Sequence, residues 1–359
     1  MLATVFENLQ ADVLVQVVRV CRRFHAVAER ALYTNIAVAE NVPRSSPVPH
    51  KTVTFCHTIL THPHLAESPK KVAVRWVTES GPREPYMQHI EPVLQLLNRA
   101  LRMLHGLESL ELALGMSGGS ISSRGILSDC AFPHLRLFAL SGVGRGGLPA
   151  KTHPTPTPPI EWFLAETPSI VHLRLADCYE VLHLSAADLP CLRTFRGSAP
   201  TAASVLPGRP VQLLSLVGHE FVTERDLERI ACASVRIRWL DLSSMSVTPL
   251  LLRDISRHLF GVEHLKVKLA LRHTLHHAMS GISLLVGLTS VLGAFPELNQ
   301  LDLSPTALDG VGDSNVSDEQ TLCDSWSRGC PTLRHIIFPS GTEWLRRDDA
   351  RWVPAAGVH

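Results

Sequence analysis

The sequence has no excess of charge of either sign, no paired cysteines and no signal peptide. Its formal net charge is +1, so no global field draws the chain to nucleic acid or to an acidic membrane, and we expect neither as a partner. The eight cysteines form no Cys-x-x-Cys pair, which argues against a zinc ribbon or a thioredoxin-like site. Unpaired cysteines beside apolar residues, together with the missing signal peptide, predict a cytoplasmic or nuclear protein.

Catalytic and metal-binding motifs are also absent. Neither a Gly-x-Ser-x-Gly elbow nor a His-Glu-x-x-His pair occurs. Gly142–Gly147 has the Gly-x-Gly-x-x-Gly spacing of a dinucleotide site, but Pro149 and a proline-rich run follow where such a site needs a helix. Two histidine groups, around Pro63 and at residues 273–277, lack the second cysteine or the glutamate of the usual zinc sites. We therefore expect no enzyme activity, no catalytic residue, no cofactor and no metal.

The chain holds one long uncharged stretch, from Ala278 to Phe295. Its 18 residues are near the lower limit for a helix that spans a membrane. The stretch contains three glycines and three serines, and no basic residue anchors its C-terminal flank. A buried helix inside the fold is the favoured interpretation, and a membrane span is the alternative.

The strongest positive signal is a leucine-rich spacing. In the repeated template, an apolar residue is followed by apolar residues three, six and eight positions later. Segments that fit in full are Leu104, Leu107, Leu110, Leu112; Phe132, Leu135, Phe138, Leu140; Leu259, Val262, Leu265, Val267; Phe295, Leu298, Leu301, Leu303; and Cys330, Leu333, Ile336, Phe338. Segments that fit in part are Ile170, Leu173, Leu175; Val211, Leu214, Leu216; Ile237, Leu240, Leu242; and Leu189, Leu192, Phe195.

This spacing has a specific physical meaning. The last two positions of the template lie two residues apart, so both side chains reach one face of a short strand. One such layer cannot bury its own apolar face, and layers therefore stack into a solenoid. The predicted fold class is α/β: a short helical N-terminal module, followed by an irregular leucine-rich repeat solenoid of parallel strands with helices on the outer side.

Local patterns set the expected boundaries. Apolar residues at three- and four-residue steps make residues 1–36 helical, and prolines after residue 42 end this module. Residues 70–77 alternate as a strand does, residues 85–105 have helical spacing, and Thr248-Pro249 marks a helix start. The expected organisation is a helical module at 1–40, a linker with a first irregular repeat or cap at 41–105, the repeat array at 106–345 and a tail at 346–359.

The N-terminal segment resembles a known family. Val20-Cys21-Arg22-Arg23-Phe24, followed by Ala28-Glu29 and Leu32-Tyr33, is similar to the F-box of fungal F-box proteins. Later segments such as Phe132-Pro133-His134-Leu135 resemble the degenerate leucine-rich repeats that accompany it. The resemblance implies that the N-terminal helices pack on a Skp-type adaptor of a Skp–cullin–F-box ubiquitin ligase, while the repeats hold a protein substrate. The docking residues that it implies are Val5, Leu9, Leu14, Val17, Val20 and Phe24.

Two points about this module stay open. The apolar stripe that suits helix-in-groove docking is equally the core of a small helical unit. The family also opens with a Leu-Pro-x-Glu segment before the first helix, which is missing here. Either the F-box is shortened and binds its adaptor weakly, or the true start lies upstream of Met1.

The repeat register predicts a binding face. If the template residues point inward, the residues before and between the last two anchors point outward along one sheet face. The partner-binding candidates at these positions are His172, Arg174, Trp239, Asp241, His264, Lys266, Gln300, Asp302 and His335. Aromatic, imidazole and mixed-charge side chains of this kind suit protein recognition, and the alternative is an ordinary solvated face.

The function predicted from the sequence is therefore substrate recognition for a ubiquitin ligase, with a Skp-type adaptor and an unidentified protein substrate as partners. A leucine-rich repeat scaffold that binds proteins without engaging a ligase is the alternative.

Overall fold

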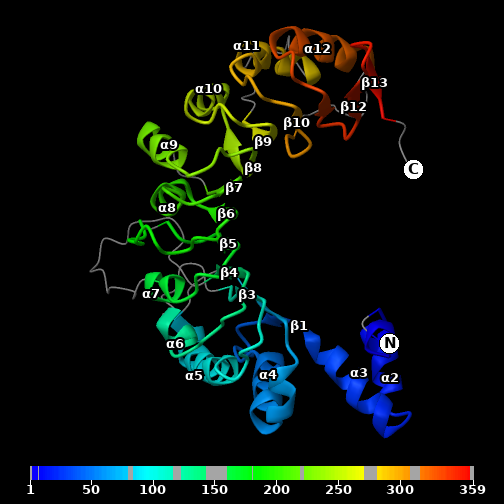
Figure 1. Ribbon diagram of the computed structural model, residues 1–359, viewed down its shortest axis with the longest axis vertical. Helices are drawn as coiled ribbons and strands as arrows, with labels where there is room; N and C mark the ends of the chain where they lie inside the picture. The colour runs from blue at the N-terminus through cyan, green and yellow to red at the C-terminus, as the bar shows by residue number, and fades with distance from the viewer. Residues whose placement is uncertain are drawn as a thin grey trace. The chain divides into compact units, whose positions relative to one another are not determined.

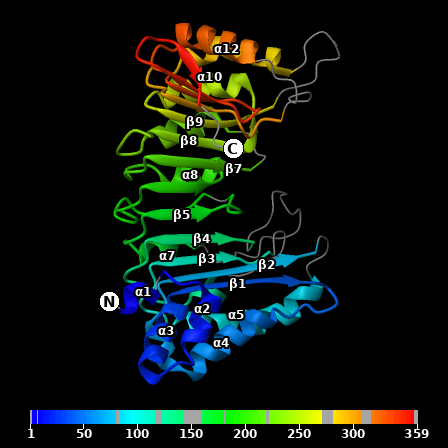
Figure 2. The ribbon, with the colours of Figure 1, turned by 90° about the vertical axis from the view of Figure 1, so that its right-hand side faces the viewer.

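The computed structural model describes residues 2–6, 8–79, 84–115, 123–142, 160–179, 181–218, 222–270, 281–307 and 316–355. It divides into two compact units: the first contains residues 1–178 and 183–191, and the second contains residues 179–182 and 192–359. Within each unit, the helices that connect the strands lie on one side of the row of strands (Figures 1 and 2). The glycine motif beyond Gly142 and the histidines at 273–277 lie outside the described residues.

The first unit begins with three short helices, α1 (Leu2–Phe6), α2 (Ala11–Val17) and α3 (Arg22–Thr34). The sequence predicted continuous helical character over residues 1–36, but the chain turns after Phe6 and again after Val17. At the second break, the backbone of Cys21 is extended (φ −160°, ψ 165°), and α3 begins at the next residue. The three helices share a small core of Phe6, Leu14 and Ala28, and they form a helical module with an interior of its own.

The strands of the first unit are β1 (Asn35–Val42), β2 (Lys71–Thr78), β3 (Ser109–Ala113), β4 (Leu137–Ser141) and β5 (His172–Leu175). They lie side by side in this order and are all parallel. The helices between them are α4 (His50–Thr61), the 3-10 helix η1 (Pro63–Glu67), α5 (Glu84–Leu101), α6 (Ser123–Leu127) and α7 (Glu161–Ala165). The parallel ladder therefore begins at Asn35, directly after α3, and upstream of the array boundary expected at residue 106.

The strands of the second unit are β6 (Thr194–Gly197), β7 (Leu213–Val217), β8 (Trp239–Val247), β9 (His264–Leu269), β10 (Gln300–Asp302), β11 (His335–Ile337), β12 (Glu343–Arg346) and β13 (Trp352–Pro354). They are parallel from β6 to β11, whereas β12 and β13 pair antiparallel. Its helices are α8 (Ala199–Val205), α9 (Glu224–Ala231), α10 (Pro249–His258), the 3-10 helix η2 (Gly281–Leu288), α11 (Thr289–Leu292) and α12 (Val316–Gly329). Thr248 caps α10 by accepting from Leu251 N, as its sequence predicted, and Thr223 with Asp226 forms a capping box on α9.

One hydrogen-bond pattern repeats from layer to layer. The carbonyl oxygen of Arg238, just before β8, accepts from the backbone N–H groups of both Glu263 (2.8 Å) and His264 (2.9 Å). The carbonyl of Glu263 accepts in the same way from Asn299 and Gln300 in the following layer. Both lone pairs of one oxygen are thus used to fix where each strand enters the sheet. The same register then aligns every layer of the unit.

The template residues form the core. All the anchors named from the full and partial fits are buried, including Leu110, Leu214, Leu240 and Leu301. Each buried leucine contributes about 2 kcal/mol of transfer free energy, so the stack supplies most of the stabilisation. The prediction that the template side chains point inward is therefore confirmed. Ala66, Pro69, Val72 and Val74 also match the template. All four residues are buried, and the last two lie in β2.

The C-terminal end of the second unit is closed by β12 and β13. Glu319 of α12 is buried, and its carboxylate accepts from Ser340 Oγ (2.6 Å) and Trp344 Nε1 (2.8 Å). These bonds join α12 to the antiparallel strands. Residues 352–354, within the segment expected as a tail, thus belong to a cap that covers the apolar end of the stack.

The uncharged stretch from Ala278 to Phe295 does not form the single buried helix that its sequence predicted. Its described part is η2 followed by α11, which is only four residues long. Gly287 and Gly293 weaken a continuous α-helix here, and the buried Leu288 and Leu292 serve as part of the core instead. In the described part of the chain, no helix is long and apolar enough to cross a membrane.

Candidate functional site

Two rows of side chains point away from the core on the strands of the second unit, and we call them the strand face. The first row contains Thr194, Leu213, Trp239, His264, Gln300 and His335. The second row contains Arg196, Ser215, Asp241, Lys266, Asp302 and Ile337. The helices of this unit lie on the opposite side of the strands (Figure 1). The strand face brings together seven of the nine partner-binding residues predicted from the sequence.

The first row is built around an aromatic stack. The rings of Trp239 and His264 lie parallel, with centroids 4.7 Å apart and an interplanar angle of 20°. The side chain of His264 continues the row through a 3.0 Å hydrogen bond between Nδ1 and Gln300 Oε1. Trp239 remains 39% exposed, so the row presents a rigid, planar apolar surface beside hydrogen-bonding groups. Side chains of this kind are typical of the centre of protein interfaces.

The second row is built from ion pairs between strands, one between the neighbours β9 and β10 and one from β6 across β7 to β8. Lys266 Nζ lies 2.8 Å from Asp302 Oδ2, and Arg196 Nη1 lies 3.7 Å from Asp241 Oδ2. Burial opposes ionisation of Asp302, but hydrogen bonds from Lys266 and Ser304 and the charge of Lys266 hold the pKa of this carboxyl below its usual value. The row is therefore a preformed lattice that needs little reorganisation before it contacts a partner.

Arg196 and Ser215 are members of this lattice that the sequence analysis missed. Arg196 donates to Ser215 Oγ (2.9 Å) and to Ser244 Oγ (2.7 Å), and Ser215 donates to Asp241 (3.1 Å). The signal was present, because Arg196 follows Phe195 in the weakest fit of the template. That segment ends at Gly197 in place of an apolar anchor, so the template predicts its outward residues only weakly.

The remaining two predicted partner-binding residues, His172 and Arg174, lie on β5 of the first unit. Arg174 reaches across Ala139 of the intervening strand β4 to Glu111 of β3, with Nη1 and Oε2 3.9 Å apart. Burial lowers the pKa of His172, and the nearby guanidinium groups of Arg174 and Arg136 lower it further. His172 is therefore a neutral hydrogen-bonding group at neutral pH.

The six predicted adaptor-binding residues do not share one surface. Val5 and Val20 are exposed, but Leu14 is buried in the core of the helical module. Leu9, Val17 and Phe24 are partly buried against that core, and the rings of Phe24 and Phe6 form a T-shaped pair with centroids 5.5 Å apart. The reason is the pair of breaks between α1, α2 and α3, which resets the helical register that the stripe assumed.

The helical module also carries two further exposed valines and a surface depression. Val13 and Val15 of α2 are exposed. A depression of about 180 Å³ is lined by Phe6, Leu9, Ala11, Leu14, Ala31, Leu32, Thr34 and Asn35. Exposed valines on a short helix are side chains suited to docking on another protein.

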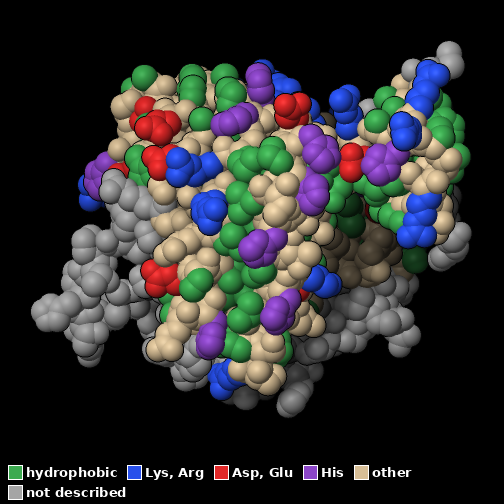
Figure 3. All heavy atoms as spheres, turned by 90° about the horizontal axis from the view of Figure 1, so that it is seen from below, with side chains coloured by type: hydrophobic (Ala, Val, Ile, Leu, Met, Phe, Trp, Pro, Cys, Tyr) green, Lys and Arg blue, Asp and Glu red, His purple; other side chains and the backbone are tan. Residues whose placement is uncertain are grey.

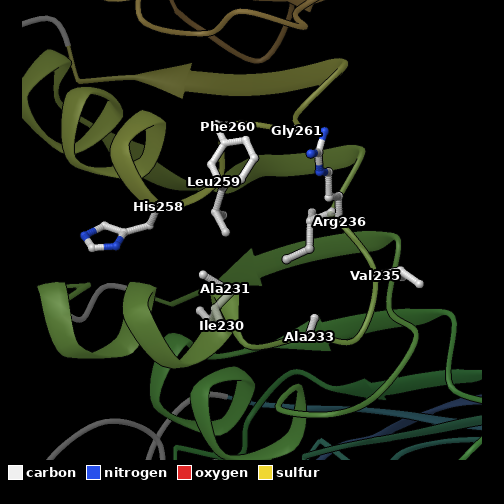
Figure 4. Close-up of a pocket in the computed structure, with 10 residues that line it drawn as sticks. Ile230, Ala231, Ala233, Val235, Arg236, His258, Leu259, Phe260 and Gly261 are labelled. Carbon is white, nitrogen blue, oxygen red and sulfur yellow. The ribbon is translucent and has the colours of Figure 1, made fainter.

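A small depression lies on the helix side of the second unit, between the ends of α9 and α10 (Figure 4). Arg236 borders it with its guanidinium 5.1 Å from the centre of the Phe260 ring, and it also donates to Glu297 (2.9 Å). Its volume is about 50 Å³, far below the several hundred Å³ of typical small-molecule sites. This depression is part of the packing between layers and not a ligand site.

Histidines are frequent on the side of the first unit where α4 lies, as Figure 3 shows from below. The rings of His62 and His64 form a T-shaped pair with centroids 6.0 Å apart, and His64 Nε2 lies 3.6 Å from the Glu29 carboxylate. His25 Nε2 lies at the same distance from Glu29. Among the residues that the structure describes, no three histidine, cysteine or acidic side chains are arranged to hold a metal ion.

The layers define a leucine-rich repeat-like fold, and this follows from the chain's own spacing and strand ladder. No protein-family model matches the sequence, and no curated protein matches it. Among solved structures, a leucine-rich repeat protein of Leptospira interrogans is similar over 87% of this chain, with 13% sequence identity and a TM-score of 0.36. The chain spans 62% of that protein's length.

Proposed function

We propose that this protein is a repeat-based interaction scaffold that holds a partner protein on the strand face of its second unit. The observation that carries the proposal is the stack of Trp239 on His264 beside the paired charges of Lys266 and Asp302. A rigid aromatic group at the centre of a hydrogen-bonded polar lattice has the composition of an interface hot spot. The proposal assigns no catalytic step to the chain.

The double variant Trp239→Ala/Lys266→Ala tests this function. Both side chains point away from the core, so the variant should fold while its capture of partner proteins falls at least about tenfold. Arg225→Ala on α9, an exposed residue on the helix side, is the matched control and should capture partners as the wild type does. Undiminished capture by a folded double variant would contradict the proposal.

We further propose that the helical module docks a Skp-type adaptor, which would make the protein the substrate-recognition subunit of a Skp–cullin–F-box ubiquitin ligase. The support is the resemblance of residues 20–33 to an F-box, together with the exposure of Val5, Val13, Val15 and Val20 in the helical module. Leu14 contributes to this role only by holding the module together, because it is buried.

Binding of a purified Skp-type adaptor to the full chain tests the ligase proposal. Val5→Asp/Val20→Asp places charges at two exposed valines of the helical module and should abolish binding without disturbing the module's core. Leu250→Asp, at an exposed leucine on α10, is the matched control and should bind normally. If the wild type binds no adaptor although the strand face still captures partners, the protein is a scaffold that is not coupled to a ligase.

A further inference from the structure

On the strand face, the cations of three ion pairs are more exposed than their carboxylates. In the pair Arg196–Asp241, the side chains are 38% and 19% exposed; in Lys266–Asp302 they are 37% and 12% exposed. At the edge of the face, Arg238 is 58% exposed and Glu263 26%. The cation is thus at least twice as exposed as its carboxylate in all three pairs, and a partner meets the cations first.

Hydrogen bonds from the backbone explain why the carboxylates lie closer to the sheet than the cations do. Asp241 accepts from the backbone N–H of Ser243, and Asp302 accepts from that of Ser304, both at 2.9 Å. Each aspartate therefore accepts a hydrogen bond from the backbone two residues further on, Asp241 within β8 and Asp302 at the end of β10, which fixes it near the sheet. The longer side chains of Arg196 and Lys266 cover these carboxylates from outside.

The face also carries cations with no carboxylate partner in the described part of the chain. The cationic side chains on the face and its N-terminal edge are Arg193, Arg196, Arg238, Lys266, Lys268 and Arg334. The carboxylates are Asp241, Glu263, Asp302 and Glu343. Arg193 and Lys268 are exposed without an ion pair to an acidic side chain among described residues, and the exposed Arg334 donates to the carbonyl of Pro331. The surplus is local, since the whole chain has a net charge of only +1.

We infer that the partner of the strand face is an extended, acidic protein segment that carries an aromatic side chain. The aromatic group stacks on Trp239, and the acidic groups meet the outer cations, including Lys268 on the neighbouring strand. The five spacings from β6 to β11 span about 24 Å, which about eight extended residues cross. This inference rests on the proposed interaction function and specifies the chemistry of its partner.

A protein segment fits better than a nucleic acid. Phosphates bind with the release of counterions from an uncompensated row of cations, whereas three of the cations here lie directly above carboxylates that repel a phosphate backbone. A peptide can place its carboxylates at the unpaired cations and an uncharged aromatic ring at Trp239.

Fluorescence anisotropy with synthetic peptides of about ten residues tests the inference on the full chain. The probes are an acidic peptide of Glu and Ser with a central Phe, the same peptide with Lys for Glu, the acidic peptide with Ser for Phe, and a single-stranded oligonucleotide. We expect the first to bind at least about tenfold tighter than each of the others, and to weaken as salt rises from about 50 to about 500 mM.

Variants of the strand face test which residues cause the preference for the acidic peptide that contains Phe. Lys268→Ala/Arg334→Ala should weaken the acidic peptide about tenfold, and Trp239→Ala should remove the advantage of Phe over Ser. Arg225→Ala should change neither. Equal or tighter binding of the basic peptide or of the oligonucleotide would overturn the inference, as would unchanged affinity in the folded Lys268→Ala/Arg334→Ala variant. If protein capture depends on Trp239 and Lys266 while the acidic peptide has no advantage, this inference fails and the proposed function stands.

Discussion

Two neighbouring leucines of β7 provide a direct test of which way the strands face. Leu214 is fully buried as a template anchor, whereas Leu213 is half-buried in the first outward row. Truncation to alanine removes the same atoms at both positions. At Leu214 the lost transfer free energy is about 2 kcal/mol, and the cavity left in a closely packed layer raises the loss to about 3 kcal/mol. At Leu213 no closed cavity forms, so the expected loss is about 1 kcal/mol or less.

Urea unfolding followed by far-ultraviolet circular dichroism measures the two losses. The midpoint of Leu214→Ala should fall clearly below that of the wild type, and the midpoint of Leu213→Ala should fall by about a third as much. Equal losses at the two positions, or a larger loss at Leu213, would refute the inward and outward alternation on which the strand face depends.

Three further predictions concern the backbone, the ion pair and the cysteines. Gly115→Ala should cost at least about 2 kcal/mol in urea unfolding, because Gly115 has φ +63° and a Cβ would lie 2.6 Å from the Trp76 carbonyl oxygen, while Gly287→Ala, with open space around it, should be nearly neutral. The pKa of Asp302 is held below its ordinary value, so its ion pair with Lys266 stabilises the fold above about pH 4, and this contribution is lost as the pH falls through the folded-state pKa; Asp302→Asn should therefore lower the urea midpoint at pH 7, and the difference from the wild type should shrink as the pH falls below about 4. Burial raises the pKa of Cys56 and of Cys130 to about 12, so iodoacetamide at pH 8 should leave both unmodified in the native protein and label the exposed Cys21, Cys191 and Cys232, as peptide mass spectrometry would show.

The repeat layers could be predicted from the sequence because each layer is encoded locally. The spacing from Phe295 to Leu303 or from Leu259 to Val267 fixes both the strand and its inward face, and Thr248-Pro249 fixes the start of a helix. The layer that enters β2 was missed because its first two anchors are Ala66 and Pro69, which are small and do not stand out as a leucine-rich signal.

The candidate site could be predicted only in outline. The outward positions follow from the alternation along a strand, but the pairs among them depend on register between strands far apart in sequence. The stack of Trp239 on His264 and the bond from Arg196 to Ser244 are set by that register. In the helical module, two turns of the chain decide that Leu14 is buried and Val20 exposed, and a helical stripe carries no information about where such turns fall.

Site-specific photo-crosslinking tests the central claim most directly. A benzophenone amino acid placed at Leu213 on the strand face, or at Leu250 on the helix side, reports which surface of the second unit touches the captured partner. The account predicts a covalent adduct with the partner from position 213 and none from position 250. Adducts from position 250 alone would contradict it.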